Sequence, residues 1–528
     1  RITIGGVTHE LATFEFSGAI HPRGYEYLTR FQVRNAAPLP TASFTYEHES
    51  FKLIKRVTLP RGGSGVRIEY DLQVRGGDEA ELAIMPMVAM RDFHATTHSF
   101  PGGFPCATRS DRIIVESTPG GTRLEMVARV AEGQELQVDP TTDWWYGIHH
   151  REEASRGQDD REDWFVPGWF RSRSSSTTHR LTIEATAVFP WVNQVSRPPV
   201  VSTASAPALE AEMDVETRLR EAADAFVVAR RKPDGSDSVT VIAGYPWFGD
   251  WGRDTFIAMP GLFFETGRFD EARQVLETFA SAQQDGIIPN RFSDYGDGCD
   301  YNSIDASLWY LHAATQYYKL TDDLVTWRQT LEPVCRRMIE AFERGTIFDI
   351  HLDDDGLISA GNEHTQLTWM DAKYGDTVFT PRHGKAVEVN ALWYSGLIDL
   401  AEIVSSSNER DATRFRAMAD RAGASLASSF WNPRDRCLYD VVRDDYRDPA
   451  IRPNQIIAVS LPHSALSIEQ QRSVVEVVSK HLLTPYGLRS LSPADPAYRP
   501  HYGGNGYERD SAYHQGTVWG WLIGPYVE

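Results

Sequence analysis

Cysteine is scarce in this sequence, which has only four cysteines in 528 residues. None of the four belongs to a CxxC pair or to a Cys/His metal pattern, and at this low density a disulfide framework is not expected. We also find no signal-peptide pattern. Both ends of the sequence look truncated, since it begins with arginine instead of methionine and stops at Glu528 inside an expected helix. A reducing compartment, the cytoplasm, is therefore expected. The four are Cys106, Cys299, Cys335 and Cys437.

Long hydrophobic runs and an excess of positive charge are missing as well. No stretch approaches the roughly 18 apolar residues that a membrane span needs. Asp and Glu number 73 against 53 Lys and Arg, so the net charge is −20. This balance argues against nucleic acid as a partner. We expect neither a membrane nor a nucleic-acid partner, and the composition fits a globular protein.

Two motifs that would suggest a cofactor are incomplete. The acidic run 353–356 lacks the full spacing and the terminal glutamate of a calcium loop, so a solvated turn is the better interpretation. The glycine-rich run 503–506 has no following Lys-Ser/Thr and is not a phosphate loop. We expect no metal and no organic cofactor.

The first 195 residues have the pattern of β-structure. Short runs such as 66–72 and 181–189 alternate apolar and polar residues, and glycine, proline and asparagine separate them. This spacing predicts an antiparallel β-sandwich over 1–195. The polar stretch 149–163 is expected to be a long loop. Residues 196–210, rich in proline, serine and alanine, are expected to be a linker.

From 211 to 528 the apolar period becomes helical. The pattern shows no βαβ alternation, which argues against a Rossmann fold or a TIM barrel. Helical hairpins with functional loops at one end indicate an (α/α) toroid as the catalytic domain, 211–528. Besides a first helix that begins near Met213, helices are expected near 267–283, 305–319, 324–343, 386–405, 410–430, 467–481 and 514–527.

The loops between these helices combine carboxylates with aromatic residues. The clearest runs from Tyr245 to Asp254, another from Thr368 to Asp371, and a third from Tyr502 to Gly516. Sugar C–H faces stack on aromatic rings, while sugar hydroxyls bond to carboxylates and arginine. The same carboxylates could supply the acid and the base that break a glycosidic bond. These loops favour a carbohydrate as ligand.

Two of these loops supply the first candidate residues. Arg253 and Asp254 follow Trp251 and could grip neighbouring hydroxyls of one sugar ring, although Asp254 could instead cap a helix that begins near Thr255. Asp371 follows Trp369, and a carboxyl beside tryptophan can stay protonated near neutral pH, as a general acid must. The alternative is an ordinary exposed loop aspartate.

The other candidates come from later in the chain. Glu388 is either a helix-start carboxylate or an inward group that binds a hydroxyl. A second carboxylate must activate water, and Glu508 and Asp510 are both available, although they could also form a local cluster with the arginine between them. His514 and Gln515 are candidate substrate contacts, and a structural histidine is the commoner alternative for the former.

Taken together these stretches resemble the C-terminal glucosidase region of glycogen debranching enzymes, the amylo-α-1,6-glucosidases. Residues 1–195 resemble the β-rich domain that precedes it in bacterial and archaeal members. The resemblance implies a six-hairpin (α/α) toroid and hydrolysis of α-1,6-linked glucose at branch points. The resembling segments are Ala243–Leu262, Asp285–Phe292, Tyr301–Trp309, Asp355–Asp371, Pro381–Trp393, Ile451–Gln455, Leu483–Leu488 and Tyr513–Tyr526.

The resemblance also assigns roles to single residues. Asp371 matches the position of the family's general acid, and Arg253 with Asp254 resembles a pair that holds the terminal glucose in related toroid glucosidases. Where eukaryotic members carry a glutamate, Val518 stands here. The base is therefore assigned to Glu508 or, second, to Asp510. The transferase barrel of the eukaryotic enzymes has no counterpart, so 4-α-glucanotransferase activity is not implied.

We therefore expect an inverting glycosidase that releases glucose from α-1,6 branch points of glycogen or branched maltodextrin. The first alternative is another toroid glucosidase, an exo-acting α-1,4-glucoamylase or a trehalase-like hydrolase. The second, from a different class, is a glucan-binding protein without catalytic activity. The substrate expected in all but the trehalase-like case is an α-glucan.

Overall fold

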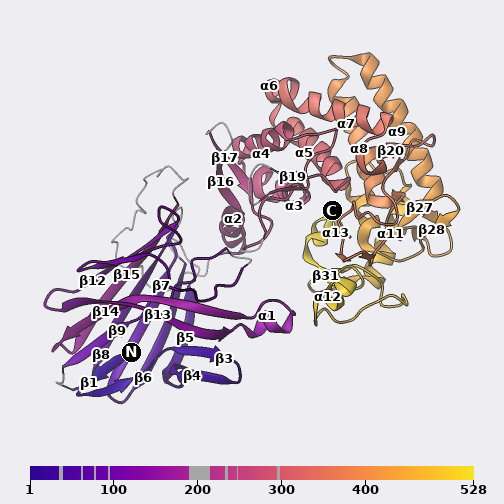
Figure 1. The fold of residues 1–528 in the computed structure, drawn as a ribbon. Helices are drawn as coiled ribbons and strands as arrows, with labels where there is room; N and C mark the ends of the chain where they lie inside the picture. Colours follow the sequence, from indigo (N-terminus) through magenta and orange to yellow (C-terminus); the bar gives the residue numbers. More distant parts are fainter. Residues whose placement is uncertain are drawn as a thin grey trace. The chain divides into compact units, whose positions relative to one another are not determined.

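The chain divides into two compact units, Arg1–Met213 and Asp214–Glu528. The structure, a computed structural model (Figure 1), describes residues 1–34, 40–60, 64–76, 79–92, 95–189, 214–231, 236–245, 248–293 and 298–528. The predicted linker, 196–210, lies outside the described residues. Each unit has its own hydrophobic core.

The first unit consists of two antiparallel sheets. The seven-stranded sheet has the order β2-β1-β9-β14-β13-β3-β4, and the eight-stranded sheet the order β10-β11-β12-β15-β8-β7-β6-β5. The strands are β1 Ile2–Ile4, β2 Val7–His9, β3 Thr13–Phe16, β4 Ala19–Arg23, β5 Leu28–Arg34, β6 Thr41–His48, β7 Phe51–Thr58, β8 Gly65–Val74, β9 Ala80–Ile84, β10 Cys106–Thr108, β11 Arg112–Glu116, β12 Arg123–Val130, β13 Glu135–His149, β14 Arg161–Ser174 and β15 Thr178–Val188.

Alternation along the strands explains how the two sheets pack. On β8 and β15 the paired residues Tyr70 and Leu181 are both buried, whereas the next pair along, Glu69 and Thr182, is less so. Apolar residues of both sheets meet in one core, which includes Phe170 of β14 together with strand residues of the other sheet. This arrangement of antiparallel sheets agrees with the expectation from sequence.

The long loop predicted over 149–163 is shorter in the structure. A short helix, α1 Arg151–Ser155, occupies its beginning, and β14 already starts at Arg161. The charged residue Glu162 is buried inside this strand, because its carboxylate accepts hydrogen bonds from Arg91, Trp164 and the Thr97 amide. A polar sequence was therefore wrongly interpreted as irregular.

The second unit is mainly helical, with short strands in its loops. Seven of the eight expected helices are present at close to the expected bounds, and the one expected over 324–343 contains a π-helical turn, Trp327–Leu331. In the described part of this unit, the α-helices of four residues or more are α2 Val215–Phe226, α3 Gly252–Met259, α4 Phe269–Ser281, α5 Asp305–Thr321, α7 Glu332–Arg344, α8 Val387–Val404, α9 Glu409–Ser429, α10 Ile457–Ser460, α11 Ile468–His481, α12 Gly506–Tyr513 and α13 Ile523–Val527.

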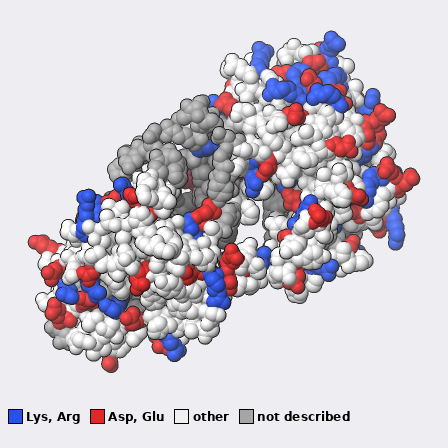
Figure 2. Space-filling view, in the orientation of Figure 1, with Lys and Arg blue, Asp and Glu red and all other residues white. Residues whose placement is uncertain are grey.

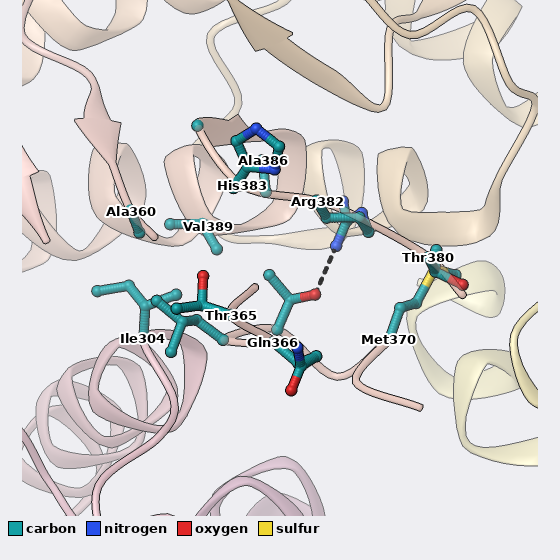
Figure 3. A pocket seen from close by; sticks show the side chains of 13 residues that line it. Ile304, Ala360, Thr365, Gln366, Met370, Thr380, Arg382, His383, Ala386 and Val389 are labelled. Carbon is teal, nitrogen blue, oxygen red and sulfur yellow. Dashed lines mark hydrogen bonds between the residues drawn. The ribbon is translucent and has the colours of Figure 1, made fainter. Parts of the chain in front are cut away.

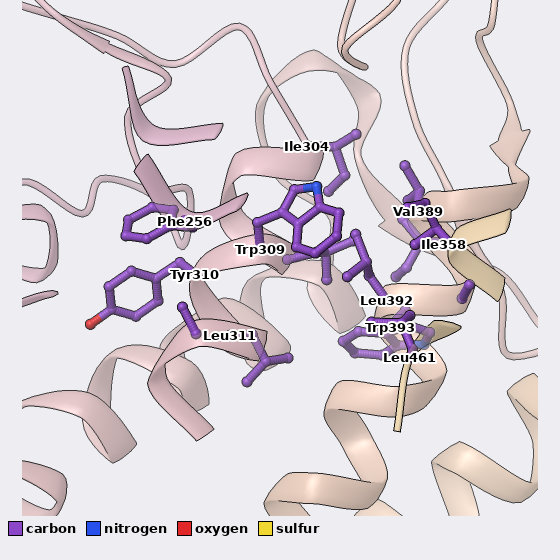
Figure 4. Close-up of a cluster of buried hydrophobic side chains, with 14 of the residues drawn as sticks. Phe256, Ile304, Trp309, Tyr310, Leu311, Ile358, Val389, Leu392, Trp393 and Leu461 are labelled. Atoms are coloured by element: carbon purple, nitrogen blue, oxygen red, sulfur yellow. The ribbon is translucent and has the colours of Figure 1, made fainter. Parts of the chain in front are cut away.

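The core of the second unit underlies the loops that carry the candidate site. Trp309, Tyr310 and Leu311 of α5 lie in the same cluster as Trp393 of α8 and Phe256 of α3 (Figure 4). Phe256 contacts Tyr310 edge to face, with ring centroids 5.2 Å apart. The first turns of α3, α5 and α8, together with the loop that contains Asp371, carry polar residues of the candidate site.

The helix predicted over 514–527 is wrong. Helix α12 ends at Tyr513, and the following residues form the short strand β31 Val518–Trp519, a 3-10 turn and only then α13. Gly516 has a φ of 141°, a conformation that ends a helix. The apolar residues of this stretch had suggested a helical face, but β31 pairs with β30 Gly487–Arg489 instead.

Charge on the molecular surface is mixed. On the face drawn in Figure 2, acidic and basic side chains are interspersed over the described part of both units. In the part of the chain that the structure describes, we find no helix with the length and apolar character of a membrane span.

Candidate active site

Asp371 lies at the point where a buried segment returns to the surface. Thr368, Trp369 and Met370 are 4%, 8% and 1% exposed, while the Asp371 side chain is 33% exposed. Its Oδ2 accepts a hydrogen bond from Nη1 of Arg253 at 3.1 Å. The carboxyl is thus fixed on one side and open to solvent on the other.

Arg253 is buried and committed to protein partners. Its Nε donates to Oδ2 of Asp305 at 2.8 Å, and Nη2 lies 3.4 Å from the Ser303 hydroxyl. Ser303 in turn donates to the other oxygen of Asp305. The expectation that Arg253 grips sugar hydroxyls therefore needs correction, because three of its nitrogens already bond to Asp305, Ser303 and Asp371. Arg253 positions the carboxyl of Asp371.

The surroundings of Asp371 favour its protonated form. Burial raises the pKa of this carboxyl above its usual value, and the nearby carboxylate of Asp305 raises it further, whereas Arg253 acts in the opposite direction. A carboxyl that keeps its proton near neutral pH can act as a general acid. The geometry therefore allows Asp371 to donate a proton to a bound ligand.

Asp254 is exposed, and among the described residues its carboxylate has no hydrogen-bond partner. Helix α3 begins at Gly252 with Trp251 as its N-cap, so Asp254 sits in the first turn. The alternative that Asp254 caps a helix starting near Thr255 is wrong. Trp251 is half-buried, and the guanidinium of Arg291 lies 5.5 Å from its ring centre.

Trp369 supports Asp371 from behind. Its indole Nε1 donates to Oδ1 of Asn454 at 2.6 Å, and its ring packs edge-on against Trp519 and Trp521. With 8% exposure this ring anchors the acid loop, so Trp369, a substrate-binding candidate from the sequence, is corrected to a structural residue.

Glu388 belongs to a buried ionic cluster. Arg382, 2% exposed, pairs with both oxygens of Glu388 and donates to Asp440 through Nε at 2.7 Å. Its Nη1 also donates to the Thr368 hydroxyl at 3.0 Å. Asp440 also accepts from Asn454 at 2.7 Å. Glu388 is therefore corrected from a substrate contact to a partner of Arg382.

His514 and Gln515 are also structural. Arg452 donates to the backbone oxygen of His514 at 2.8 Å and to Oε1 of Gln515 at 2.9 Å. Burial lowers the pKa of His514 well below its usual value, so the ring is neutral and its Nδ1 accepts from the Ala372 amide. Both residues are buried, at 1% and 8% exposure. Both residues hold the loop after Asp371 in place. They are therefore corrected from substrate contacts to structural residues.

The two candidate bases differ in what their carboxylates do. Glu508 forms a capping box with Asn505, in which Glu508 Oε2 accepts from the Asn505 amide at 2.9 Å. Asp510 lies two residues further along α12, and no hydrogen bond to its carboxylate is found among the described residues. Glu508, the base favoured from the sequence, is the third residue of this capping box, in which Asn505 is the N-cap.

A small pocket lies beside this network. Arg382, Thr380 and Met370 line one side of it, and Ile304 and Val389 the other (Figure 3). The dashed line in Figure 3 is the hydrogen bond from Arg382 to Thr368. Asp371 does not line the pocket, so the pocket backs the acid loop and is separate from the exposed side of the acid.

One group of side chains has the composition of a metal site. Asp399, Glu402 and His463 offer ligand atoms within 4.8 Å of one another. The ammonium of Lys319, however, donates to Oδ1 of Asp399 and to Oε2 of Glu402 at 2.8 Å. This cation already neutralises the carboxylates, which makes the cluster an ion pair.

Sequence reasoning missed most of the support for the acid loop. Asp305 is the first residue of α5, and no sequence pattern indicated its bond to Arg253. Arg382, Arg452 and Asn454 lie in segments that carried the family resemblance, and this was the only signal available. Asp440 gave none.

Comparison with known proteins places both units. The model of the family described as "Amylo-alpha-1,6-glucosidase" matches residues 221–528, more than half of the chain. The model described as "Glycogen debranching enzyme N terminal" matches residues 1–179. The glycogen debranching enzyme of Saccharomyces cerevisiae is 27% identical over 393 residues, which cover 56% of this chain and 25% of the yeast protein. The match spans about a quarter of that relative's length.

Of two solved structures that match this chain, the first below shows a likeness of fold. A bacterial glucoamylase complexed with acarbose is 12% identical, with a TM-score of 0.53 over 99% of this chain and 79% of the other. A rhamnosidase from Klebsiella oxytoca with rhamnose bound is 14% identical, with a TM-score of 0.42 over 76% of this chain and 79% of the other.

Proposed function

This chain belongs to the amylo-alpha-1,6-glucosidase family, and from that premise we propose that it releases glucose from the α-1,6 branch points of a glycogen-like glucan. The observation that carries the proposal is the environment of Asp371. Its carboxyl is anchored by Arg253, its pKa is raised by burial, and one side of it is open to solvent. A glycosidase needs such a group to protonate the leaving oxygen.

The proposed mechanism is inverting. Asp371 donates its proton to the oxygen that links the glucose to the main chain, while a second carboxylate activates water on the opposite face of the sugar. Of the two predicted bases we now favour Asp510, because Glu508 is engaged in the helix cap. Asp254 and Trp251 hold the glucose, in keeping with the exposed carboxylate of Asp254, to which no other described residue donates a hydrogen bond.

The remaining features of the proposal concern organisation. We propose that residues 1–195 support a catalytic domain, 211–528, which is a six-hairpin (α/α) toroid. The close packing of α3 on α5, α5 on α8 and α8 on α9 supports this arrangement. The cytoplasm stays the proposed compartment, since all four cysteines are free. Glycogen or branched maltodextrin is the proposed substrate.

Incubation with limit dextrin tests the function. Free glucose from the branched polymer, with none from linear maltodextrin, is the result we expect. Glucose from both substrates would instead indicate an exo-acting α-1,4-glucoamylase, and glucose from trehalose a trehalase-like hydrolase. Binding of dextrin without release of glucose would indicate a glucan-binding protein and overturn the proposal.

Asp254 offers a test of how the glucose is held. Replacing it with asparagine should lower kcat/KM on limit dextrin by about tenfold or more, since a hydrogen bond to a charged group contributes about 1.5–3 kcal/mol. The melting temperature should stay nearly unchanged, because in the described part of the chain no other residue donates a hydrogen bond to this carboxylate. Asp270→Asn is the matched control, another first-turn aspartate, 93% exposed. A lower melting temperature with normal kinetics would mean a structural role.

Two variants test whether Glu508 or Asp510 is the catalytic base. Glu508→Gln should keep both the cap and the activity, because glutamine can accept the same hydrogen bond. Asp510→Ala should lose turnover by about 10²-fold or more, the usual contribution of a general base. Azide should restore part of that turnover. If neither variant loses activity, the base lies outside this loop.

A further inference from the structure

Exposed tyrosines gather next to the proposed acid. Tyr374, Tyr502 and Tyr507 are 50%, 52% and 48% exposed. Single exposed aromatic residues are common on proteins, but adjacent ones indicate a binding surface. Here the rings contact each other: Tyr374 and Tyr507 meet edge to face with centroids 5.6 Å apart.

The chain fixes these rings relative to Asp371. Tyr374 lies three residues after the acid, in the hairpin formed by β22 Lys373–Tyr374 and β23 Thr377–Val378. Phe379, just beyond the hairpin, contacts the ring of Tyr507 on α12 at 5.2 Å. Tyr374 and Tyr507 therefore keep their places beside the acid loop.

Both ends of this hairpin are also tied to the segment after α12. The Ala372 amide donates to His514, and the side chain of Gln515 donates to the backbone oxygen of Phe379 at 2.8 Å. Tyr513, the residue before His514, contacts the ring of Tyr502 at 5.8 Å. The aromatic cluster therefore borders the acid on the side of its own hairpin.

The position of the cluster decides which part of the substrate it meets. A general acid contacts the glycosidic oxygen, which remains bonded to the leaving group. At a branch point the leaving group is the α-1,4-linked main chain, and the single glucose lies on the other side. Rings on the hairpin of the acid therefore face the main chain, while Asp254 comes from a different element, α3.

We propose that Tyr374, Tyr502 and Tyr507 form a glucan-binding surface that holds the main chain at the branch point. This inference rests on the proposed function, which it deepens by assigning the polymer its own site. Tyrosine suits that ligand because its ring stacks on the apolar face of a sugar while its hydroxyl stays in water.

The test compares a long and a short leaving group. In the full chain, the Tyr374→Ala/Tyr507→Ala double variant should lower kcat/KM on limit dextrin by about tenfold, a factor that corresponds to about 1.4 kcal/mol. The loss should appear mainly in KM. On α-glucosyl fluoride, which carries no main chain, the loss should be no more than about twofold. Equal losses on both substrates would overturn the proposal.

Binding measurements separate this proposal from the proposed function. Maltoheptaose binding, followed by calorimetry, should weaken in the double alanine variant and persist in Tyr374→Phe/Tyr507→Phe, which keeps both rings. Tyr486→Ala is the control, since this tyrosine is 84% exposed. If the wild type releases no glucose, the proposed function fails while the binding result still decides the surface. Unchanged maltoheptaose affinity in the alanine variant would refute it.

Discussion

Replacing Asp371 with asparagine lowers turnover on limit dextrin by about 10²-fold or more, because acid catalysis typically contributes about 10²–10⁴-fold. Asparagine keeps the size of the side chain and can accept the hydrogen bond from Arg253, so the fold is retained. Steady-state kinetics beside circular dichroism measure both effects. A folded variant with near-normal turnover would remove Asp371 from the mechanism.

The same assignment predicts a pH dependence. The protonated carboxyl is the active form, so kcat falls as the pH rises through the pKa of Asp371, a pKa that burial and then Asp305 raise. Asp305→Asn removes a negative charge and frees Arg253 to act on the acid. The alkaline limb of the kcat profile should therefore move to lower pH. A limb that stays in place would show that another group controls it.

Replacing Arg382 with methionine is expected to destabilise the helical unit by about 3–5 kcal/mol, the cost of leaving one side of a buried ion pair uncompensated. Glu388 and Asp440, both 2% exposed, would each lose their charged partner. Urea unfolding measures the change. Activity should fall as well, because Arg382 holds Thr368 in the acid loop.

Two further variants make this prediction specific. Arg220→Met breaks an exposed pair with Glu216 and should cost no more than about 1 kcal/mol. Arg382→Lys keeps the charge but loses the two-pronged geometry, so an intermediate loss is expected. If Arg382→Met unfolds no earlier than Arg220→Met, the cluster contributes nothing measurable to stability.

Periodicity in the sequence was enough to predict most of the fold. Alternation gave the strands around 66–72 and 181–189, and the helical period placed α5 and α8 within a few residues. It failed over 514–527, where Val518 and Trp519 form a strand through pairing with a segment about 30 residues earlier. Local patterns do not encode such pairing.

In the candidate site, too, single residues could be identified from the sequence, whereas their long-range contacts could not. Asp371 and Arg253 were both singled out from their own loops, but their mutual bond joins residues far apart in the chain. Glu388 and His514 have polar side chains of the kind that ligand sites use, and only burial reveals them as structural. Asp440 has no distinctive neighbours in sequence, so its place among Arg382, Asn454 and Glu388 could not be foreseen.

The anchors of the acid loop have a consequence for how activity arises during folding. Asp371 bonds to a partner 118 positions away, and its neighbours Trp369 and Ala372 to partners 85 and 142 positions away. Contacts between such distant positions form late, because long stretches of chain must close first. Enzymatic activity therefore recovers after helix content in refolding, and a partly folded chain with native helices is inactive. Recovery of activity is therefore a measure of complete folding.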